Sequence, residues 1–536
     1  MASNNDNQQT SGIEEVEGIN TTLSNLALTD SRDDLANCMA RPNFGVEGRK
    51  ITVHANVFPI TVTRKSMIIY QYDILIEKAV KSKGELKAGR ELSWKIWKQL
   101  CAKSPGHIKR DLEAASFDRQ SNFYTPYKLK LSNPVVTIRI ELPDTTATTE
   151  KQKQANTFKC TIKLVREVDL HSLVTYCQGG VYDEATSAMV AAAKAAINVL
   201  LRQDLYDRYL QKGGKGRRFF TLENLNEMSD GGRILNGFIQ SVIPTQSGQA
   251  ALQMNAAYGP FFKPNILINI LEEIVSGRGG GLRGRGGYRA GDRGNRGEGG
   301  AAGNTQGNSQ LLVDGIWKQK KQFEILLNRT RFNLTHRQSN QPLQIDGLTD
   351  KNANELLFKM ANPDGGQDTM ISVTDFYKKV HNITLSYPCL PLVRTAHKGT
   401  PKQKIKDNNN GQNKDKNKDN NKYSFYPMEL VKLTDFNGIP FTAVSSSQTA
   451  EMIKVTAKRP EERKASIMKW RQELDYSSLP RLKDWCLEIS PFMMEVNARI
   501  LDPPEVRYKG SFASPNYGTW GLNRHKFVKA NKDLRA

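Results

Sequence analysis

Long hydrophobic runs and paired cysteines are both missing from this 536-residue sequence. No run of eighteen apolar residues occurs, so the sequence predicts no transmembrane helix, and the polar start MASNNDNQQTSGIEEVEG has no secretory signal pattern. The six cysteines lie far apart and never form CxxC, which argues against a zinc ribbon or a disulfide scaffold. We therefore expect reduced thiols, no membrane partner and a cytoplasmic location, with the nucleus as the alternative.

The residue patterns of known hydrolytic and metal sites are also absent. The seven histidines are scattered, and HExxH, GxSxG and GxxxxGK[ST] do not occur. Paired carboxylates such as Glu272 and Glu273 fit the solvated face of a helix better than an active site. The sequence thus predicts no catalytic residue, no metal site, no cofactor and no small-molecule substrate.

What the sequence does have is positive charge. Lys and Arg number 77 against 55 Asp and Glu, a net charge of +22, which favours a polyanionic partner. A hydrophobic content of 38% is low for a fully compact chain, and residues 1–40 are predicted to be a disordered tail. A glycine–arginine tract at 277–300 is predicted either to bind RNA without sequence preference or to act as a solubilising linker. Its arginines are Arg278, Arg283, Arg285, Arg289, Arg293 and Arg296.

Hydrophobic periodicity predicts an α+β protein of several domains with mostly antiparallel sheets. Alternating apolar residues indicate strands at 51–62, 67–77, 135–142 and 158–170, and helical spacing indicates helices at 91–101 and 183–203. Residues 233–275 are predicted to form a strand, a turn, a strand and a short helix.

The second half of the chain follows the same rules. We predict that ordered structure resumes near residue 312, with strands at 322–336, 342–349 and 425–433. Residues 383–395 are predicted to be a strand that prolines interrupt, at a sheet edge or leading into a loop. A helix at 371–382 would be capped by Ser372 or Thr374, and residues 449–474 supply further helical material. The Lys/Asn-rich run at 398–422 is predicted to be a solvated loop.

Aromatic and basic residues alternate in the segment 358–432. Aromatic rings offer stacking surfaces to bases, and basic groups neutralise phosphates, so this density favours nucleic-acid binding. Taken singly, each aromatic residue is more often a core residue than a ligand-binding one. The candidate RNA-binding residues are Phe358, Phe376, Tyr377, His381, Tyr387, Lys422 and Phe425.

Several segments, in uninterrupted order over about residues 41–536, resemble the N-terminal half of a eukaryotic Argonaute. They include RPNFGVEGRKITVHANVFPITV (41–62), FKCTIKLVREVDLHSL (158–173), GGRILNGFIQSVIPT (231–245), ISVTDFYKKVHNITLSYPCLPLVR (371–394) and ILDPPEVRYKGS (500–511). The resemblance implies an N domain at 41–222, a first linker at 223–263, a PAZ domain at 264–458 and a second linker at 459–536. Within the PAZ range, 276–311 and 398–422 would be insertions.

A PAZ domain implies an OB-like β-barrel with an αβ insertion that holds the 3′ end of a small guide RNA, in a complex that includes further silencing proteins. Phe358 would stack beside the terminal nucleotides, and His381 would keep the histidine that contacts the phosphate. Phe376 and Phe425 stand where the family often has tyrosine, and Gln341 to Gln344 replace a basic stretch. We therefore expect weakened phosphate binding.

The resemblance stops at the second linker, so the MID domain and the metal-dependent PIWI nuclease of the family are expected to be missing. The sequence leaves three functions open. The first is a non-cleaving guide-RNA-binding protein of gene silencing. The second is an RNA chaperone or scaffold that uses the glycine–arginine tract and has a vestigial PAZ pocket. The third is the N-terminal fragment of a full-length slicer.

Overall fold

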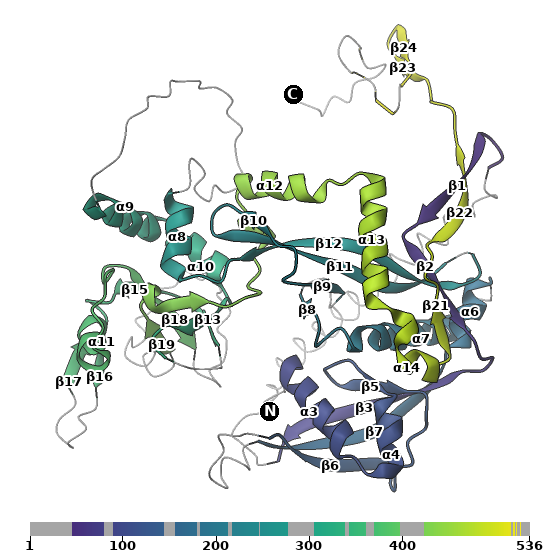
Figure 1. Ribbon diagram of the computed structural model, residues 1–536, viewed down its shortest axis with the longest axis horizontal. Helices are drawn as coiled ribbons and strands as arrows, with labels where there is room; N and C mark the ends of the chain where they lie inside the picture. The colour runs from purple at the N-terminus through teal and green to yellow at the C-terminus, as the bar shows by residue number, and fades with distance from the viewer. Residues whose placement is uncertain are drawn as a thin grey trace, which may run out of the picture. The chain divides into compact units, whose positions relative to one another are not determined.

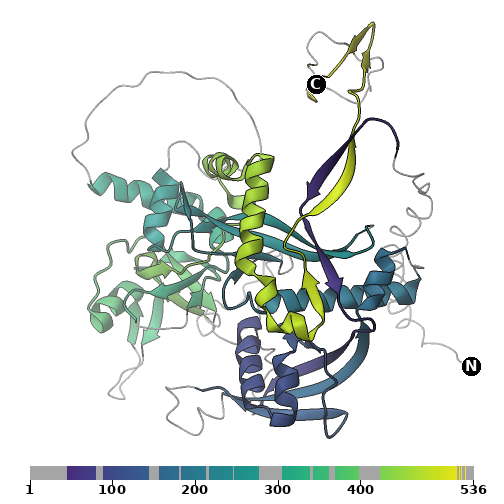
Figure 2. The ribbon, with the colours of Figure 1, turned by 45° about the vertical axis from the view of Figure 1, so that its right-hand side comes forward.

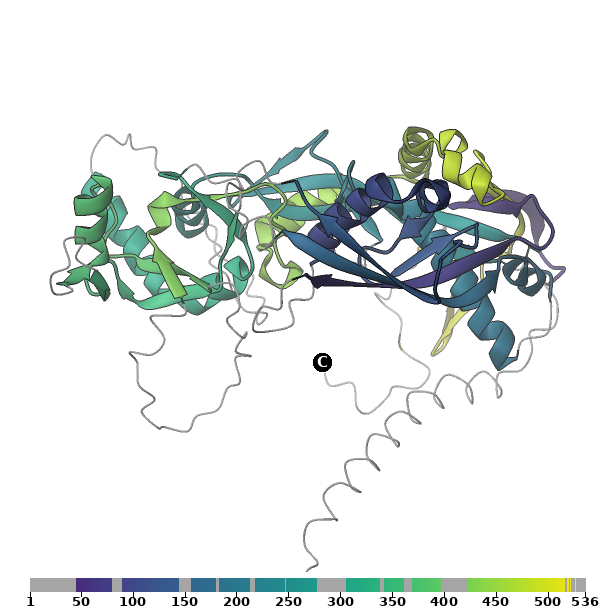
Figure 3. The same cartoon turned by 90° about the horizontal axis from the view of Figure 1, so that it is seen from below.

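The computed structural model describes residues 45–79, 89–143, 156–179, 183–212, 217–245, 247–276, 305–337, 342–360, 369–396 and 423–515, with positions 518, 519, 521 and 526. The predicted tail, the glycine–arginine tract and the Lys/Asn loop lie outside these residues. The chain divides into a large unit, residues 55–494, and a small unit made of residues 1–54 and 495–536. Figures 1 to 3 show the ribbon from three directions.

The large unit begins with a five-stranded antiparallel sheet in the order β4-β5-β3-β7-β6. Two helices, α3 and α4, pack on one face and bury Trp97, Leu100 and Leu112 against the apolar positions of the strands (Figure 3). The alternation seen in the sequence is therefore the pleat of half-buried strands. The elements are β3 (Ile68–Lys78), α3 (Arg90–Lys103), α4 (Gly106–Glu113), β4 (Ser116–Phe117), β5 (Asn122–Thr125), β6 (Val135–Glu141) and β7 (Thr157–Asp169).

A long hairpin organises the second sheet. Its strands β11 and β12 pair without interruption from Gly232 with Phe262 to Pro244 with Ala250. The sheet runs β21-β2-β12-β11-β9-β8, with β10 also paired to β11, and α13 packs on β12 (Figure 2). The strands are β2 (Val57–Val62), β8 (Leu210–Gln211), β9 (Arg218–Phe220), β10 (Asn226–Met228), β11 (Gly232–Pro244), β12 (Ala250–Phe262) and β21 (Leu487–Ile489), and the helices are α6 (His171–Cys177), α7 (Glu184–Gln203), α13 (Pro460–Leu474), η4 (Tyr476–Ser478) and α14 (Pro480–Asp484).

Helix α7 has the length and mean hydropathy of a helix that could cross a membrane. The sequence alone did not indicate it, because α7 contains no unbroken run of eighteen apolar residues. The side chain of Asp183, the residue before α7, caps the first turn by accepting a hydrogen bond from the Thr186 amide at 2.7 Å. Ala193, Ala196, Ile197 and Leu200 are buried in the largest hydrophobic core of the chain. Core helices meet the same criterion of length and composition, and one face of α7 packs in this core.

The third part of the large unit contains two three-stranded antiparallel sheets, β14-β13-β20 and β15-β18-β19, and the hairpin β16-β17. Helices α8, α9 and α10 share one core with the first two sheets. The elements are α8 (Leu267–Ser276), α9 (Thr305–Lys318), α10 (Lys320–Leu327), β13 (Arg331–Leu334), β14 (Leu343–Gln344), β15 (Gly347–Asn352), β16 (Leu357–Met360), β17 (Thr369–Ser372), α11 (Val373–His381), β18 (Pro391–Ala396), β19 (Tyr423–Tyr426), η2 (Met428–Leu430), β20 (Val431–Leu433), η3 (Phe441–Ala443) and α12 (Ser446–Thr456).

The predicted α+β fold with antiparallel sheets is confirmed, but four local predictions are wrong. The strand predicted at 322–336 begins only at Arg331, because residues 320–327 form α10. Helix α9 already begins at Thr305, before the predicted start of order at residue 312. The single strand predicted at 425–433 is instead two short strands, β19 and β20, separated by the 3-10 helix η2. The proline-interrupted strand predicted at 383–395 is confined to β18, since residues 382–390 form turns and extended chain around Pro388.

The small unit is a ribbon in which β1 (Arg49–Ala55) pairs with β22 (Met494–Ile500). The Arg499 guanidinium donates a hydrogen bond to the Val46 carbonyl at 2.7 Å and ties the start of the ribbon to its end. A second, short hairpin joins β23 (Val506–Tyr508) to β24 (Ser511–Ala513).

Candidate functional site

Five aromatic rings meet where α11 lies beside the end of β13. We call Phe358, Phe376, Tyr377, His381 and His336 the aromatic–histidine cluster. The rings of Phe358 and Phe376 meet edge to face with centroids 5.2 Å apart, and Phe376 lies 5.5 Å from His381. The two histidine rings are 4.9 Å apart, and each lies 5.4 Å from Tyr377. Such spacings are those of favourable aromatic pairs.

Local folding of the β16–β17–α11 segment sets the positions of four of these rings. The Ser372 hydroxyl caps α11 by accepting from the Asp375 amide at 3.0 Å, which selects Ser372 rather than Thr374 as the N-cap. The helix ends at Asn382, whose left-handed φ of 52° turns the chain away. Between these ends Phe376, Tyr377 and His381 fall at neighbouring positions of the helix surface, and β16 brings Phe358 to them.

Burial differs within the cluster. Tyr377 is 3% exposed and lies in a small core with Ala353, Leu385 and Leu392. Phe358 and Phe376 are only partly buried and pack on the edge of this core. The buried tyrosine therefore anchors the cluster, while the two phenyl rings keep accessible surface for another ring or base.

The two histidines of the cluster have ring nitrogens without hydrogen-bond partners. Both ring nitrogens of His336 and Nε2 of His381 are buried without a hydrogen-bond partner. Buried polar atoms are paired in the great majority of cases, so three orphaned nitrogens in one cluster call for an explanation such as a ligand or an ion. Burial, together with His381 and Arg337, lowers the pKa of His336 from its ordinary value of 6.5. Burial also raises the pKa of Tyr377 well above its ordinary value.

The other predicted site residues are placed elsewhere or lie outside the described chain. Phe425, on β19, packs on the same small core. Tyr387 packs instead against the larger core of the two three-stranded sheets, and its amide donates to Glu429 Oε1 at 3.1 Å. Lys422 and the six arginines of the glycine–arginine tract are not among the described residues.

His336 was missed by sequence reasoning, which considered only the segment 358–432. A signal was nevertheless present. Every second residue of β13, Phe332 and Leu334, is buried. His336 is the next residue in this two-residue period, so the strand pattern would place it on the same buried side. A polar residue at a position predicted to face the core is a reason to suspect a functional group.

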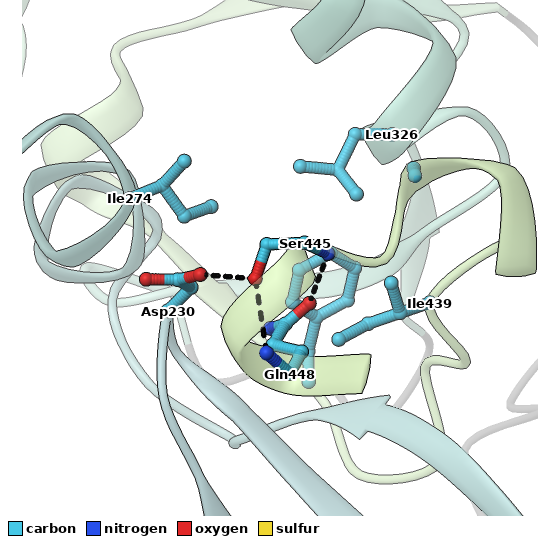
Figure 4. A pocket seen from close by; sticks show the side chains of 8 residues that line it. Asp230, Ile274, Leu326, Ile439, Ser445 and Gln448 are labelled. Carbon is cyan, nitrogen blue, oxygen red and sulfur yellow. Dashed lines mark hydrogen bonds between the residues drawn. The ribbon is translucent and has the colours of Figure 1, made fainter. Parts of the chain in front are cut away.

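A second polar site, which we call the Ser445 junction, lies where α12 begins. It is formed by the hydrogen-bonded residues Ser229, Asp230, Ser445, Ser447, Gln448 and Glu451. Three of them, Asp230, Ser445 and Gln448, also line a small pocket (Figure 4). The Ser445 hydroxyl donates to Asp230 at 2.6 Å, and Ser445 and Gln448 form a reciprocal capping box. The pocket has room for about one water molecule between its side chains, which is too little to bury an organic ligand.

No three His, Cys, Asp or Glu side chains gather to hold a metal ion within the part of the chain that the structure describes. The aromatic–histidine cluster is thus the described site whose chemistry best suits a ligand. Its rings suit a base or a sugar, and its nitrogens and Arg337 suit an anion.

Comparison with known proteins places family models on three ranges. The N-terminal domain of argonaute matches residues 49–201, the PAZ domain matches residues 306–453, and the Argonaute linker 2 domain matches residues 462–508. The range of the PAZ model contains all five residues of the aromatic–histidine cluster.

Curated relatives extend the similarity over nearly the whole chain. It is 23% identical over 503 residues to the protein argonaute PNH1 of Oryza sativa subsp. japonica, and 24% identical over 501 residues to protein argonaute 10 of Arabidopsis thaliana. Each alignment covers 92% of this chain but 43% of the relative, so the chain spans about two fifths of the length of these relatives. The crystal structure of Kluyveromyces polysporus Argonaute with a guide RNA matches with a TM-score of 0.48 and 18% identity, over 91% of this chain and 50% of that chain.

Proposed function

Because this chain carries the N-terminal, PAZ and linker 2 domains of the Argonaute family, we propose that it binds the 3′ end of a small guide RNA and works in RNA silencing. The observation that carries the proposal is the aromatic–histidine cluster within the PAZ range. Silencing-complex proteins are the further partners we propose, and the cytoplasm is the proposed location, with the nucleus as the alternative.

The chemistry of the cluster supports a nucleotide end as the ligand. Phe358 and Phe376 are partly buried and offer ring surface on which the last bases can stack. His336 and His381 offer three ring nitrogens that have no hydrogen-bond partner among the described residues, and Arg337 adds a cation beside His336. Phosphate oxygens accept hydrogen bonds from such donors. Stacking on one side and donors on the other suit a single-stranded end better than a duplex.

Two positions at which the resemblance implies basic residues carry none. Where a basic stretch is expected, Leu343 and Gln344 form the short strand β14, and the Gln344 amide donates to the Arg329 carbonyl at 2.9 Å. These two residues pair in the sheet, and neither side chain carries a positive charge for a phosphate. We therefore propose that 3′-end binding rests on stacking and on the two histidines.

Substitution of Phe358 by alanine tests the proposal. One stacking contact is worth about 1–3 kcal/mol, which corresponds to a roughly ten- to hundred-fold loss of affinity. We expect that loss for an RNA with a free two-nucleotide 3′ overhang, and no loss for the same RNA with a blocked 3′ end. The matched control is Phe492→Ala, which removes a phenyl group that is 73% exposed in the loop before β22.

Three results would contradict the proposal: equal losses on the two RNAs, no loss on either, or a wild-type protein that does not distinguish them. Because Phe358 also packs on the small core, the melting temperature of the variant is measured in parallel. A lower melting temperature together with weaker binding of every RNA would assign Phe358 a purely structural role.

The chain by itself is predicted not to cleave RNA, and this stays a prediction. Guide-directed product that persists through purification, in Mg²⁺ or Mn²⁺, would contradict it and favour the slicer hypothesis. The scaffold hypothesis makes a different prediction, that deletion of residues 277–300 removes most RNA affinity and most of its salt dependence.

A further inference from the structure

The two histidines of the aromatic–histidine cluster form a pair that lacks the partners histidines ordinarily have. Their ring centroids are 4.9 Å apart with the planes inclined by 57°. Three of their four ring nitrogens are buried without a hydrogen-bond partner. A neutral imidazole donates one hydrogen bond and accepts another, whereas a protonated one donates two. The protonation state of the pair therefore decides how many donors face a ligand here.

The charged and titratable groups around the pair are few. Arg337, in the turn after β13, interacts electrostatically with both His336 and Tyr377. Tyr426, on β19, interacts electrostatically with Tyr377. Lys378 and Lys379 are exposed in the last turn of α11, and Asp375 is hydrogen-bonded to Ser372 at the other end of that helix. The charged groups that lower the pKa of His336 are therefore cationic, and among the described residues no carboxylate is paired with either histidine ring.

We propose that an RNA 3′-end phosphate is bound together with a proton taken up by the His336–His381 pair, so that affinity for the free 3′ end rises as the pH falls. This inference rests on the proposed function and adds proton coupling to it. The phosphate supplies the missing anion, and the added N–H group supplies a charge-assisted donor. Before binding, two adjacent protonated rings would repel each other and the nearby guanidinium.

The sign of the pH effect follows from linkage. Burial, His381 and Arg337 lower the pKa of His336 in the free protein, and a bound anion raises it. Between the two values the complex holds more protons than the free protein, so binding strengthens as pH falls through this window and levels off below it. Uptake of one proton changes the affinity by up to about tenfold per pH unit.

The experiment measures affinity of the full chain between pH 6.0 and 7.5, at constant ionic strength, for two RNAs that differ only in a free or a blocked 3′ end. We expect affinity for the free end to rise by roughly three- to tenfold per pH unit as the pH falls, with a much smaller slope for the blocked end. His336→Gln and His381→Gln should each flatten the slope. The matched control, His107→Gln, changes an exposed histidine on α4 and should keep it.

Calorimetry on the wild-type protein gives a second readout that does not depend on the folding of a variant. Binding enthalpies in two buffers of different ionisation enthalpy report proton uptake, which should be larger for the free end than for the blocked end. Selective 3′-end binding with no proton uptake, or with affinity that falls at low pH, would overturn the inference and leave the proposed function standing. Equal affinity for the two RNAs at every pH would overturn both.

Discussion

The Ser445 junction and the aromatic–histidine cluster are two polar sites of the same chain with opposite hydrogen-bonding states. At the junction Asp230 accepts from Ser445 at 2.6 Å, Glu451 accepts from the Ser229 hydroxyl at 3.1 Å, and Glu273 accepts from the Gly231 amide at 2.7 Å. None of its buried side-chain polar atoms lacks a partner, whereas the cluster contains three such atoms. Both sites are polar and partly buried, so composition alone does not separate them.

We infer that this difference separates a structural site from a ligand site. A fully paired network rigidifies the place where it lies, and the junction accordingly fixes α12 to the turn before β11. An unpaired buried group costs free energy, which a fold tolerates most readily where a ligand completes the hydrogen bonds. We therefore assign stability to the junction and binding to the cluster, and the predictions below test the two assignments separately.

The largest expected effect on stability is that of Gly231→Ala at the junction. Gly231 has a φ of +65°, and an added Cβ would lie 2.7 Å from Cγ2 of Ile270, which is fully buried and cannot move aside. The left-handed backbone and the overlap together should cost about 2–5 kcal/mol. We expect a lower urea midpoint and a lower melting temperature.

Gly248→Ala is the matched control for this substitution. Gly248 has a φ of +84°, but the nearest atom to an added Cβ is Gln178 Cγ at 3.9 Å, so only the backbone cost of about 1–2 kcal/mol applies. Equal losses for the two variants would show that packing against Ile270 does not hold the junction together.

A smaller effect is expected from Ser445→Ala, which removes the N-cap of α12 and leaves Asp230 without its closest donor. Loss of a serine N-cap costs about 0.5–2 kcal/mol. Urea unfolding should show this loss, while affinity for a free RNA 3′ end should stay unchanged. A variant as stable as wild type but weaker in 3′-end binding would reverse the assignment of the junction.

The smallest stability change is expected from His336→Phe. Replacing a buried group that has no hydrogen-bond partner by an apolar ring is nearly neutral or stabilising, so the melting temperature should stay the same or rise. Binding of the free 3′ end should nevertheless weaken. A clear loss of stability would mean that the ring nitrogens of His336 are paired in solution, and the contrast with the junction would disappear.

The same histidine predicts how wild-type stability changes with pH. The pKa of His336 is lowered in the folded protein from the ordinary 6.5, so the unfolded chain binds more protons below that pH. Its contribution to stability is complete above about pH 6.5 and is lost as the pH falls further. The urea midpoint of the wild type should therefore fall more steeply below pH 6.5 than that of His336→Phe.

Much of the fold could be predicted because local patterns decided it. β3, β7, α7 and α11 each have a periodicity that only one kind of element satisfies. Helix α10 was mistaken for a strand because Phe323, Ile325 and Leu327 alternate as strand residues do. In the structure Phe323, Leu326 and Leu327 are buried at helical spacing, and Ile325 is 63% exposed. This short apolar run satisfies both the strand period and the helix period, so periodicity alone did not decide between them.

The candidate site was predictable to the extent that it is local. Phe358, Phe376, Tyr377 and His381 all lie in or beside one hairpin and its following helix, so sequence proximity indicated them. His336 reaches them only because β13 ends beside α11, a tertiary contact that no local pattern reveals. Tyr387 shows the converse, since it is close in sequence to the cluster but packs against another core.

The most direct measurement is a photo-crosslink from the 3′-terminal nucleotide of a short RNA to the full chain, with the modified peptides identified by mass spectrometry. If the cluster holds the 3′ end, the crosslinks lie in the peptides that contain Phe358, Phe376, Tyr377 and His381, and an excess of RNA with a free 3′ end removes them while a blocked RNA does not. Crosslinks confined to residues 277–300, competed equally by both RNAs, would contradict 3′-end capture by the cluster and favour the scaffold function.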